Sequence, residues 1–307
     1  MARHRALNDT ETRLMHNNTT RPLAAFRPRT LLACLWAALA LPGLAHAQSQ
    51  DPAASPVAAQ MYTLRDVGSL EQQFAAVERA GIASVELVGD QGVVAEEMNA
   101  LLAEHELSVS SSHVPLDDLR HDLDDVVAFH RAIGNDTLVI PYLAEDERPD
   151  SAEGWRALGE EIGGLASRLA EDDMRLAYHN HDFEMRTFDG RTALEILLEA
   201  AGPEVMGEVD LAWVARGGQD PAEYLEHFDG RLFAIHAKDN APAGTAEDQR
   251  GFAIIGQGVL DWDELLPAAR EAGAEVYVIE HDQPKDAQAV LTEGNRFLEA
   301  ALSAQAD

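Results

Sequence analysis

Residues 205–239 read VMGEVDLAWVARGGQDPAEYLEHFDGRLFAIHAKD and contain two apolar runs with a helical stretch between them. The runs at 205–210 and 232–236 have the length and apolar content of buried strands. Residues 221–227 have amphipathic helical spacing and follow a glycine turn at 217–218. Two buried strands joined through a helix form a parallel pair. The stretch therefore predicts one strand–helix–strand unit.

The same alternation continues on both sides of this unit. The expected strands are 60–64, 83–88, 107–113, 137–142, 174–179, 205–210, 232–236 and 275–280. The expected helices are 70–80, 95–105, 116–133, 152–171, 193–201, 221–227, 262–272 and 287–304. Eight such units in about 260 residues predict an α/β protein with a single (β/α)8 TIM barrel. An open doubly wound sheet is the alternative, but no glycine-rich phosphate loop follows the first strand.

The N-terminal region has the pattern of an export signal. A basic stretch at 21–29 precedes the uncharged run LLACLWAALALPGL at 31–44, and the small-x-small site AHA follows at 45–47. These three parts are typical of a secretory signal peptide. We therefore expect a signal peptide at 1–47, a flexible linker at 48–59 and the catalytic barrel at 60–307. An uncleaved anchor and a lipoprotein signal at Cys34 are the alternatives.

Cys34 is the only cysteine, and it lies inside the expected signal. An exported protein without this segment has no disulfide, although a periplasmic or secreted location permits disulfides. A large apolar core must then stabilise the fold, and a chain of this length can form one. We expect a periplasmic or secreted protein.

The chain is strongly acidic, with 23 Lys and Arg against 54 Asp and Glu and a formal net charge of −31. Such a surface repels nucleic acid and anionic membranes. It also suits a neutral sugar better than a phosphorylated one. The expected partner is a small-molecule sugar or keto-sugar, without nucleic acid and without membrane association after signal cleavage. A homo-oligomer is compatible with the sequence, which leaves the oligomeric state open.

Ionisable residues are concentrated where the expected strands end. They include Glu86, His113, His179, His181, Asp210, His236, Lys238 and Glu280. The active site of a TIM barrel lies at the carboxyl ends of its strands. Carboxylates and imidazoles gathered there suit a hard or borderline divalent ion with open coordination positions. A closed structural zinc site is disfavoured, because the barrel has no thiolate.

Five segments carry a resemblance to a known family. They are YHNHDFEM (178–185), VDLAWVARGGQDPAEYL (209–225), IHAKD (235–239), GQGVLDWDELL (256–266) and VIEHD (278–282). With these segments in this order, the chain resembles the sugar phosphate isomerase/epimerase family of xylose isomerase-like TIM barrels over residues 60–305. The resemblance implies a metal-dependent sugar isomerase, epimerase or carbon–oxygen lyase of carbohydrate metabolism. It implies one divalent ion, manganese first, with zinc, cobalt or magnesium as alternatives.

The resemblance assigns the ion to four residues at the ends of strands five to eight, which are here His179, Asp210, His236 and Glu280. The sequence departs from the family at the first of them, where the family usually has Glu. His181 is the alternative ligand, because it lies two residues on and on the same side of an extended chain. Otherwise His181 contacts the substrate or supports the ion from outside its ligand shell.

The histidine at position 179 bears on the expected reaction. Epimerases of this family use two metal-bound glutamates, one on each face of the sugar. With Glu280 as the one carboxylate base, we expect proton abstraction next to a keto-sugar carbonyl, followed by loss of a β substituent. Lys238 is expected to orient a hydroxyl or act as general acid, or else to pair with a rim carboxylate such as Asp239. Plain isomerisation or epimerisation is the alternative reaction.

Three further residues are expected to bind substrate. Glu86 and His113 should face the far side of the pocket, and Trp213 should line it or pack beside it. Three other histidines, at 121, 130 and 227, lie on outer helices and are expected at the surface. A non-catalytic sugar-binding barrel is a further alternative. An apurinic endonuclease is disfavoured because it needs more metal ligands and a basic face.

Overall fold

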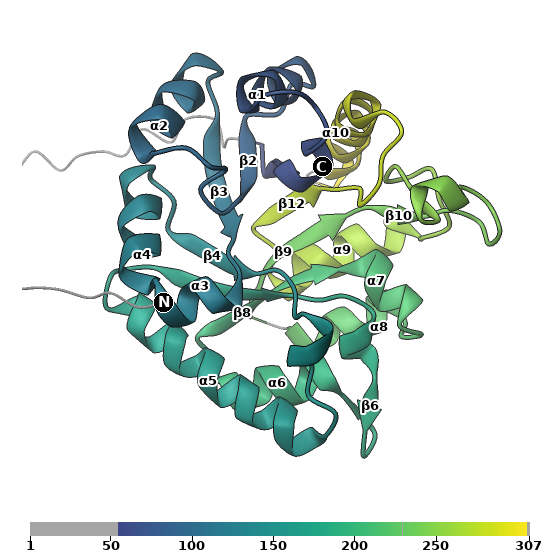
Figure 1. Ribbon diagram of the computed structural model, residues 1–307. Helices are drawn as coiled ribbons and strands as arrows, with labels where there is room; N and C mark the ends of the chain where they lie inside the picture. The colour runs from purple at the N-terminus through teal and green to yellow at the C-terminus, as the bar shows by residue number, and fades with distance from the viewer. Residues whose placement is uncertain (1–54, 229, 306–307) are drawn as a thin grey trace, which may run out of the picture. The chain divides into compact units, whose positions relative to one another are not determined.

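The computed structural model describes residues 55–228 and 230–305, and the expected signal peptide lies outside these residues. Eight parallel strands close into a barrel in the order β1-β12-β9-β8-β5-β4-β3-β2. They are β1 (Val57–Gln60), β2 (Ser84–Val88), β3 (Ser108–His113), β4 (Thr137–Ile140), β5 (Arg175–His179), β8 (Val205–Asp210), β9 (Leu232–Ala237) and β12 (Val276–Ile279). Figure 1 shows the helices arranged around these strands. The predicted (β/α)8 barrel is confirmed.

Ten α-helices are described. They are α1 (Leu70–Arg79), α2 (Ala95–Glu104), α3 (Leu116–His121), α4 (Leu123–Ala132), α5 (Ala152–Ala170), α6 (Ala193–Ala201), α7 (Leu211–Arg216), α8 (Pro221–Leu225), α9 (Trp262–Ala272) and α10 (Ala287–Ala304). Two short hairpins project from the loops, β6 (Thr187–Phe188) with β7 (Arg191–Thr192) and β10 (Asp239–Asn240) with β11 (Phe252–Ala253). Helix α10 packs beside α1, so the end of the barrel chain meets its beginning (Figure 1).

The first strand lies earlier than the sequence indicated. Strand β1 covers Val57–Gln60, inside the segment expected to be a linker, and Met61–Leu64 forms a 3-10 helix. Every residue of β1 is buried, and the strand pairs with both β12 and β2. Its small residues resemble a linker by composition, but small side chains also suit the crowded centre of a barrel. The strand expected at 60–64 is therefore wrong, and residues 57–59 belong to the barrel and not to the expected linker at 48–59, whose first part lies outside the described residues.

The period of two along the strands divides the barrel interior into layers. Ala58, Val139, Ala177, Phe233, Ala234 and Val278 form a buried apolar cluster. Two residues beyond three of these apolar side chains, on the same face of each strand, lie His179, His236 and Glu280. The apolar layer therefore forms a floor, and the ionisable residues lie above it toward the carboxyl ends of the strands.

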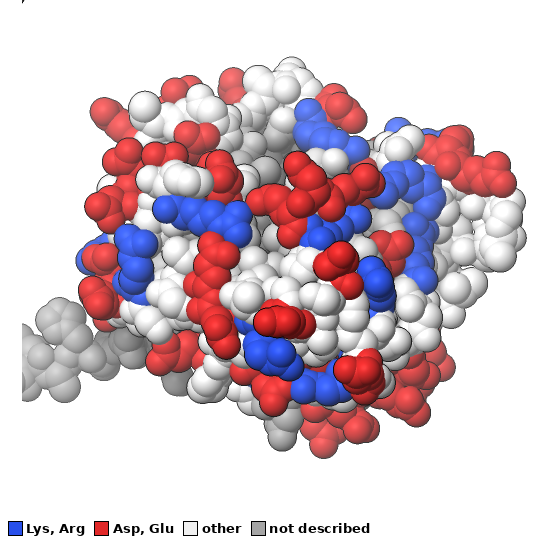
Figure 2. Space-filling model, turned by 60° about the horizontal axis from the view of Figure 1, so that its bottom comes forward, with Lys and Arg blue, Asp and Glu red and all other residues white. Residues whose placement is uncertain are grey.

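The surface seen in Figure 2 is rich in acidic side chains, which spread over the whole visible face with basic side chains between them. This agrees with the excess of Asp and Glu in the sequence. No helix within the described residues is long and apolar enough to span a membrane.

His130 is buried, which corrects the expectation that it lies at the surface. It is 2% exposed on α4, and its Nδ1 lies 3.2 Å from Asn135 Nδ2. The Asn135 amide is oriented by two hydrogen bonds with Thr137, so its N–H group faces the ring. The ring nitrogen must accept this bond and is therefore unprotonated. Burial lowers the pKa of His130 to about 4, and the charge of Asp90 opposes this only in part.

Stability should therefore fall as the pH drops from about 6.5 to 4. The unfolded chain binds a proton at His130 before the folded chain does, so protonation favours unfolding by about 3 kcal/mol at most. His130→Gln should remove this component of the pH dependence. Urea unfolding at pH 7 and pH 5 measures it, with His121→Gln at an exposed position as the control. Equal pH dependence of native protein and His130→Gln would contradict the assignment.

Helices α5 and α6 approach each other closely at two glycines of α5. A Cβ at Gly159 would lie 2.3 Å from the carbonyl oxygen of Leu197, and one at Gly163 would lie 2.4 Å from that of Ala201. Backbone atoms cannot move aside as a flexible side chain can. The two glycines therefore set the distance between α5 and α6.

Gly163→Ala should destabilise the protein by about 1–3 kcal/mol, because the new methyl group forces the two helices apart. Gly164→Ala is the matched control. It lies on the same helix with no atom within 4 Å of an added Cβ, and it should stabilise by about 0.5–1 kcal/mol through helix propensity. Chemical denaturation measures both free energies of unfolding. Equal changes in the free energy of unfolding for the two substitutions would mean that the close approach of α5 and α6 at Gly163 does not affect stability.

Candidate functional site

Five charged or ionisable side chains form what we call the mouth cluster: Asp210, His236, Lys238, Glu280 and Asp282. Lys238 follows β9 directly, and its Nζ lies 2.8 Å from Asp210 Oδ2, 2.6 Å from Glu280 Oε2 and 2.5 Å from Asp282 Oδ2. The Nδ1 atom of His236 lies 3.3 Å from Glu280 Oε2 and 3.9 Å from Asp210 Oδ2. One ammonium group and one imidazole thus connect three carboxylates.

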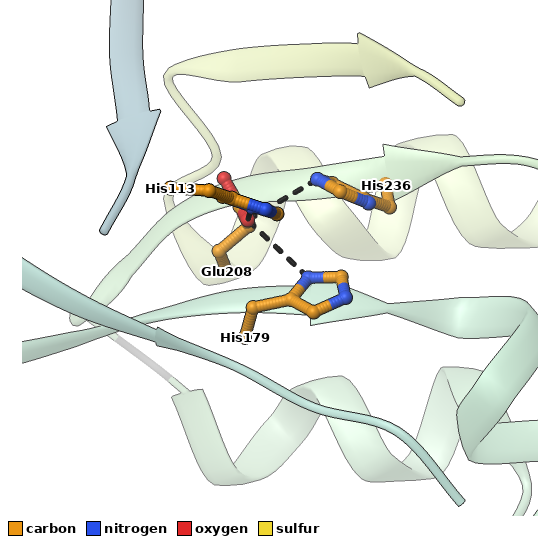
Figure 3. Close-up of side chains that lie close together, drawn as sticks. All are labelled: His113, His179, Glu208 and His236. Carbon is orange, nitrogen blue, oxygen red and sulfur yellow. Dashed lines mark hydrogen bonds and ion pairs between the residues drawn. The ribbon is translucent and has the colours of Figure 1, made fainter. Parts of the chain in front are cut away.

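A second group, the inner cluster, comprises Glu86, His113, His179 and Glu208 and shares His236 with the first. Glu208 Oε2 lies 2.8 Å from His113 Nε2, 3.2 Å from His179 Nδ1 and 3.1 Å from His236 Nε2. Figure 3 shows these three imidazoles, from three different strands, directed at one carboxylate. The inner cluster is therefore a set of imidazoles around buried glutamates.

The Glu86 carboxylate accepts hydrogen bonds from polar residues of the two neighbouring strands. Gln60 Nε2 donates to its Oε1 at 2.6 Å, and Ser111 Oγ donates to its Oε2 at 2.6 Å. Its Oε1 also lies 2.9 Å from His236 Nε2. Gln60 comes from β1 and Ser111 from β3, so both flanking strands fix the position of this carboxylate.

A pocket of about 410 Å³ opens above the two clusters. Its lining residues are Tyr62, Val88, His113, Pro141, Tyr142, His179, His181, Arg250, Glu280 and Asp282. Both lining carboxylates follow β12, whereas the lining histidines come from β3 and β5 and the residues just after it. The pocket thus has an acidic side and an imidazole side.

The two glutamates of the inner cluster differ in their ionisation. Burial raises the pKa of Glu86, but the charge of His113 and hydrogen bonds from the imidazoles outweigh it and hold this pKa well below 4.5. Burial and the negative charge of Glu86 together raise the pKa of Glu208. Burial lowers the pKa of His113, yet the two carboxylates raise it to about 9. Burial and its positively charged neighbours hold the pKa of His179 well below 6.5.

In the mouth cluster, the opposite charges stabilise one another. Burial lowers the pKa of Lys238, but Asp210, Asp282 and Glu280 outweigh this and raise it. Burial raises the pKa of Glu280, but the Lys238 charge prevails and lowers it. Burial raises the pKa of Asp210 to about 6, although Lys238 opposes the shift. Glu280 therefore presents an ionised carboxylate to the pocket.

Several buried polar atoms of the site have no hydrogen-bond partner. Within the described residues, these are His181 Nδ1 and Glu208 Oε1, whereas His179 Nδ1 and Asp210 Oδ2 have only their ion-pair contacts with Glu208 and Lys238. Such atoms are rare in folded proteins unless a ligand, ion or water satisfies them. The donor atoms of Asp210, His236 and Glu280 lie within 4.8 Å of one another, as do those of His113, His179, Glu208 and His236. Both groups have the donor types and spacing that a divalent ion requires.

The four expected metal ligands thus fall into two groups. Asp210, His236 and Glu280 lie together, whereas His179 belongs to the inner cluster, with its ring centre 4.2 Å from that of His236. The alternative ligand, His181, lines the pocket beside Tyr142 and Trp213. It is in neither group of donor atoms.

Lys238 does form an ion-pair network, but Asp239 is not its partner. The Asp239 carboxylate instead accepts hydrogen bonds from four backbone N–H groups between Gly256 and Leu260 and from Trp262 Nε1. It therefore fixes the loop before α9. Lys238 is fully buried and does not line the pocket, so it acts on the pocket through Glu280 and Asp282.

The expected substrate-binding residues occupy different positions. His113 lines the pocket, but Glu86 is fully buried beneath it. Trp213 is 5% exposed and packs against Phe252, with its ring centre 5.3 Å from Lys238 Nζ. Trp213 is therefore a packing residue under the mouth cluster rather than part of the pocket lining.

Two carboxylates of the site were not among the expected residues. Glu208 lies two residues before Asp210 and Asp282 two residues after Glu280, so each shares a strand face or its continuation with an expected ligand. The period of two along a strand was the signal that identifies them. Tyr142 was expected in the strand 137–142, but β4 ends at Ile140 and Tyr142 lies in the loop that follows. Arg250 also comes from a loop, where no such period exists.

Comparison with known proteins agrees with this architecture. The family model described as xylose isomerase-like TIM barrel matches residues 74–301. The chain belongs to this family. None of the curated proteins compared with the chain matches it in sequence.

Solved structures of similar fold include proteins of several kinds. A sugar phosphate isomerase/epimerase from Parabacteroides distasonis has a TM-score of 0.67 at 20% identity, over 85% of this chain and 99% of that one. The IOLI protein with a bound zinc atom has a TM-score of 0.65 at 17% identity, over 81% and 98%. The probable 3-DHS dehydratase AsbF of Bacillus anthracis has a TM-score of 0.62 at 13% identity, over 79% and 98%. At these identities the likeness extends to the fold.

Proposed function

We propose that this protein is an exported, divalent-metal-dependent sugar enzyme that removes a proton next to the carbonyl of a keto-sugar and then eliminates a β substituent. The observation that supports this most is the placement of Glu280. Its carboxylate lines the pocket, and the Lys238 ammonium 2.6 Å from Oε2 keeps it ionised. An ionised carboxylate at the wall of a sugar-sized pocket can accept a proton.

Asp210, His236 and Glu280 are the residues that would hold the ion. Two carboxylates and one imidazole leave positions for substrate oxygens and suit manganese, with zinc, cobalt or magnesium as alternatives. Lys238 pairs with the same carboxylates, and Asp282 offers its ammonium a partner beside them. The lysine can therefore keep an ion pair when the other two carboxylates bind metal. When bound, the ion would polarise the carbonyl and stabilise an enediolate.

The proton balance follows from the positions of the side chains. Glu280 takes the proton from the carbon next to the carbonyl, and the electron pair of that C–H bond forms a carbon–carbon double bond as the β carbon–oxygen bond breaks. The departing oxygen takes up a proton from water, and the proton on Glu280 then returns to solvent. His181 also lines the pocket and, as a neutral imidazole, can donate a hydrogen bond to the departing oxygen.

The distribution of carboxylates favours elimination over epimerisation. A two-base epimerase needs an acid–base group on each face of the sugar. Here both carboxylates that line the pocket follow β12. Burial, followed by the charge of Lys238, lowers the pKa of His181 to about 3, so the opposite side presents a neutral imidazole. This asymmetry suits chemistry on one face.

A neutral keto-sugar outside the cytoplasm is the substrate class that fits best. The high negative charge of the chain disfavours phosphorylated sugars. The signal pattern in residues 1–47 supports a periplasmic or secreted location. A 3-keto-glycoside carries both required features, because its C2 hydrogen is next to the carbonyl and its aglycone is the β substituent.

The test uses p-nitrophenyl 3-keto-glucoside with the Mn²⁺-loaded protein. Elimination should release p-nitrophenol, and Glu280→Gln should lower the rate by about 10²–10⁴-fold, the usual contribution of a general base. Glu275→Gln is the matched control, because Glu275 precedes the same strand and pairs with Arg175 on the surface. Its rate should equal that of the native protein.

Three outcomes would overturn the proposal. Exchange of the C2 hydrogen for solvent deuterium with inversion and no release would indicate a plain epimerase. Undiminished release by Glu280→Gln would remove this residue from the chemistry. Binding of the keto-sugar without turnover at any divalent metal would indicate a sugar-binding barrel.

A further inference from the structure

The inner cluster brings three imidazole nitrogens to a single carboxylate oxygen. The distances from Glu208 Oε2 to His113, His179 and His236 are 2.8, 3.2 and 3.1 Å. The four residues come from β3, β5, β8 and β9, so the arrangement depends on the closed barrel and on no local turn. These separations are those of hydrogen bonds, and small movements would bring the same nitrogen and oxygen atoms around one small cation.

No lysine or arginine among the described residues pairs with the carboxylates of this cluster, so protonated imidazoles offset their negative charge. Glu86 and Glu208 are both fully buried. Within the described residues, the ion-pair partners of these two carboxylates are all imidazoles. A divalent ion would balance two carboxylates while the imidazoles remain neutral ligands. Buried carboxylates without such a partner cost several kcal/mol each.

Among the described residues, Glu208 Oε1 has no hydrogen-bond partner. His179 Nδ1 lies 3.2 Å from Glu208 Oε2, but without hydrogen-bond geometry. Both residues are buried. His113 and His179 also line the pocket, so an ion between them would lie at the pocket floor with access for a water or substrate oxygen.

We propose that His113, His179 and Glu208 form a second divalent metal site, distinct from the ion proposed at Asp210, His236 and Glu280. Two imidazoles and one carboxylate with an open fourth position suit zinc, iron or nickel better than magnesium. This proposal does not depend on the reaction proposed above. It makes the site a two-ion centre at the floor of one pocket.

His236 lies between the two proposed metal sites and faces each of them with a different ring nitrogen. Its Nδ1 faces Glu280 and Asp210, and its Nε2 faces Glu86 at 2.9 Å and Glu208 at 3.1 Å. A neutral imidazole has a lone pair on one nitrogen only. With Nδ1 on the first ion, the Nε2 hydrogen is donated to Glu86, which is the usual carboxylate support of a metal-bound histidine. His236 therefore supports the second ion without being its ligand.

Metal stoichiometry tests the second site. The metal-stripped full chain is dialysed against Zn²⁺ alone, and bound zinc per chain is measured by elemental analysis. Native protein should bind two ions, Asp210→Asn and Glu208→Gln one each, and the double variant none. Co²⁺ in Asp210→Asn should give visible d–d absorption that is lost on adding Glu208→Gln.

The controls separate misfolding and loss of function from loss of the ion. Circular dichroism verifies that each variant is folded, and His113→Gln serves as a second variant of the same site. One zinc in the native protein that both inner-cluster variants retain would overturn the proposal. Two bound ions with no turnover of keto-sugars would leave the second site standing and refute the proposed reaction.

Discussion

Burial of charge inside the barrel is the constraint on which the site depends. Glu86, Glu208 and Asp210 are fully buried, and so is Lys238, one of only two lysines in the chain. A charge removed from water costs several kcal/mol unless an opposite charge lies close to it. The apolar floor of the barrel offers no such partner. The charged side chains must therefore neutralise one another, which draws them into two connected clusters at one end.

This constraint also explains why the clusters are arranged in layers. Strands of a barrel present alternate side chains to the interior, so a position two residues on lies one layer higher. His236 and Lys238 come from one chain segment and belong to successive layers, as do Glu208 and Asp210. His236 is the contact between the layers, because its two nitrogens face different carboxylates. A substitution in either layer should therefore alter the interactions of His236 with the other layer.

The sequence predicted the barrel and the end at which ionisable residues gather, because apolar runs and helical spacing repeat eight times. It located Asp210, His236 and Glu280 in one site. It could not place His179 in a different group, because strand-end position does not fix the direction of a ring. It misplaced β1, whose small residues resemble a linker, and it missed the burial of His130, because a position on an outer helix does not by itself show which face of the helix is buried. Loop residues such as Arg250 have no periodic signal.

Family membership alone does not select a reaction, since barrels of this kind support different chemistries through different rim residues. The proposed choice of elimination over epimerisation rests on the unequal sides of the pocket. Its carboxylates follow β12, and its imidazoles come from β3 and β5 and the residues just after β5. In the proposed reaction, a neutral imidazole in place of a second carboxylate leaves one base at the reacting carbon. We propose elimination for this reason, because epimerisation needs a second acid–base group on the opposite face of the sugar and elimination does not.

The location of a bound ion is the most direct test of metal dependence. Crystals of the full chain soaked in Mn²⁺ would be measured for anomalous scattering. We predict a peak between the side chains of Asp210, His236 and Glu280, with Lys238 moved toward Asp282, and no such peak in Asp210→Asn crystals. Manganese only at surface carboxylates, with Lys238 still paired with Asp210 and Glu280, would contradict a metal-dependent mechanism.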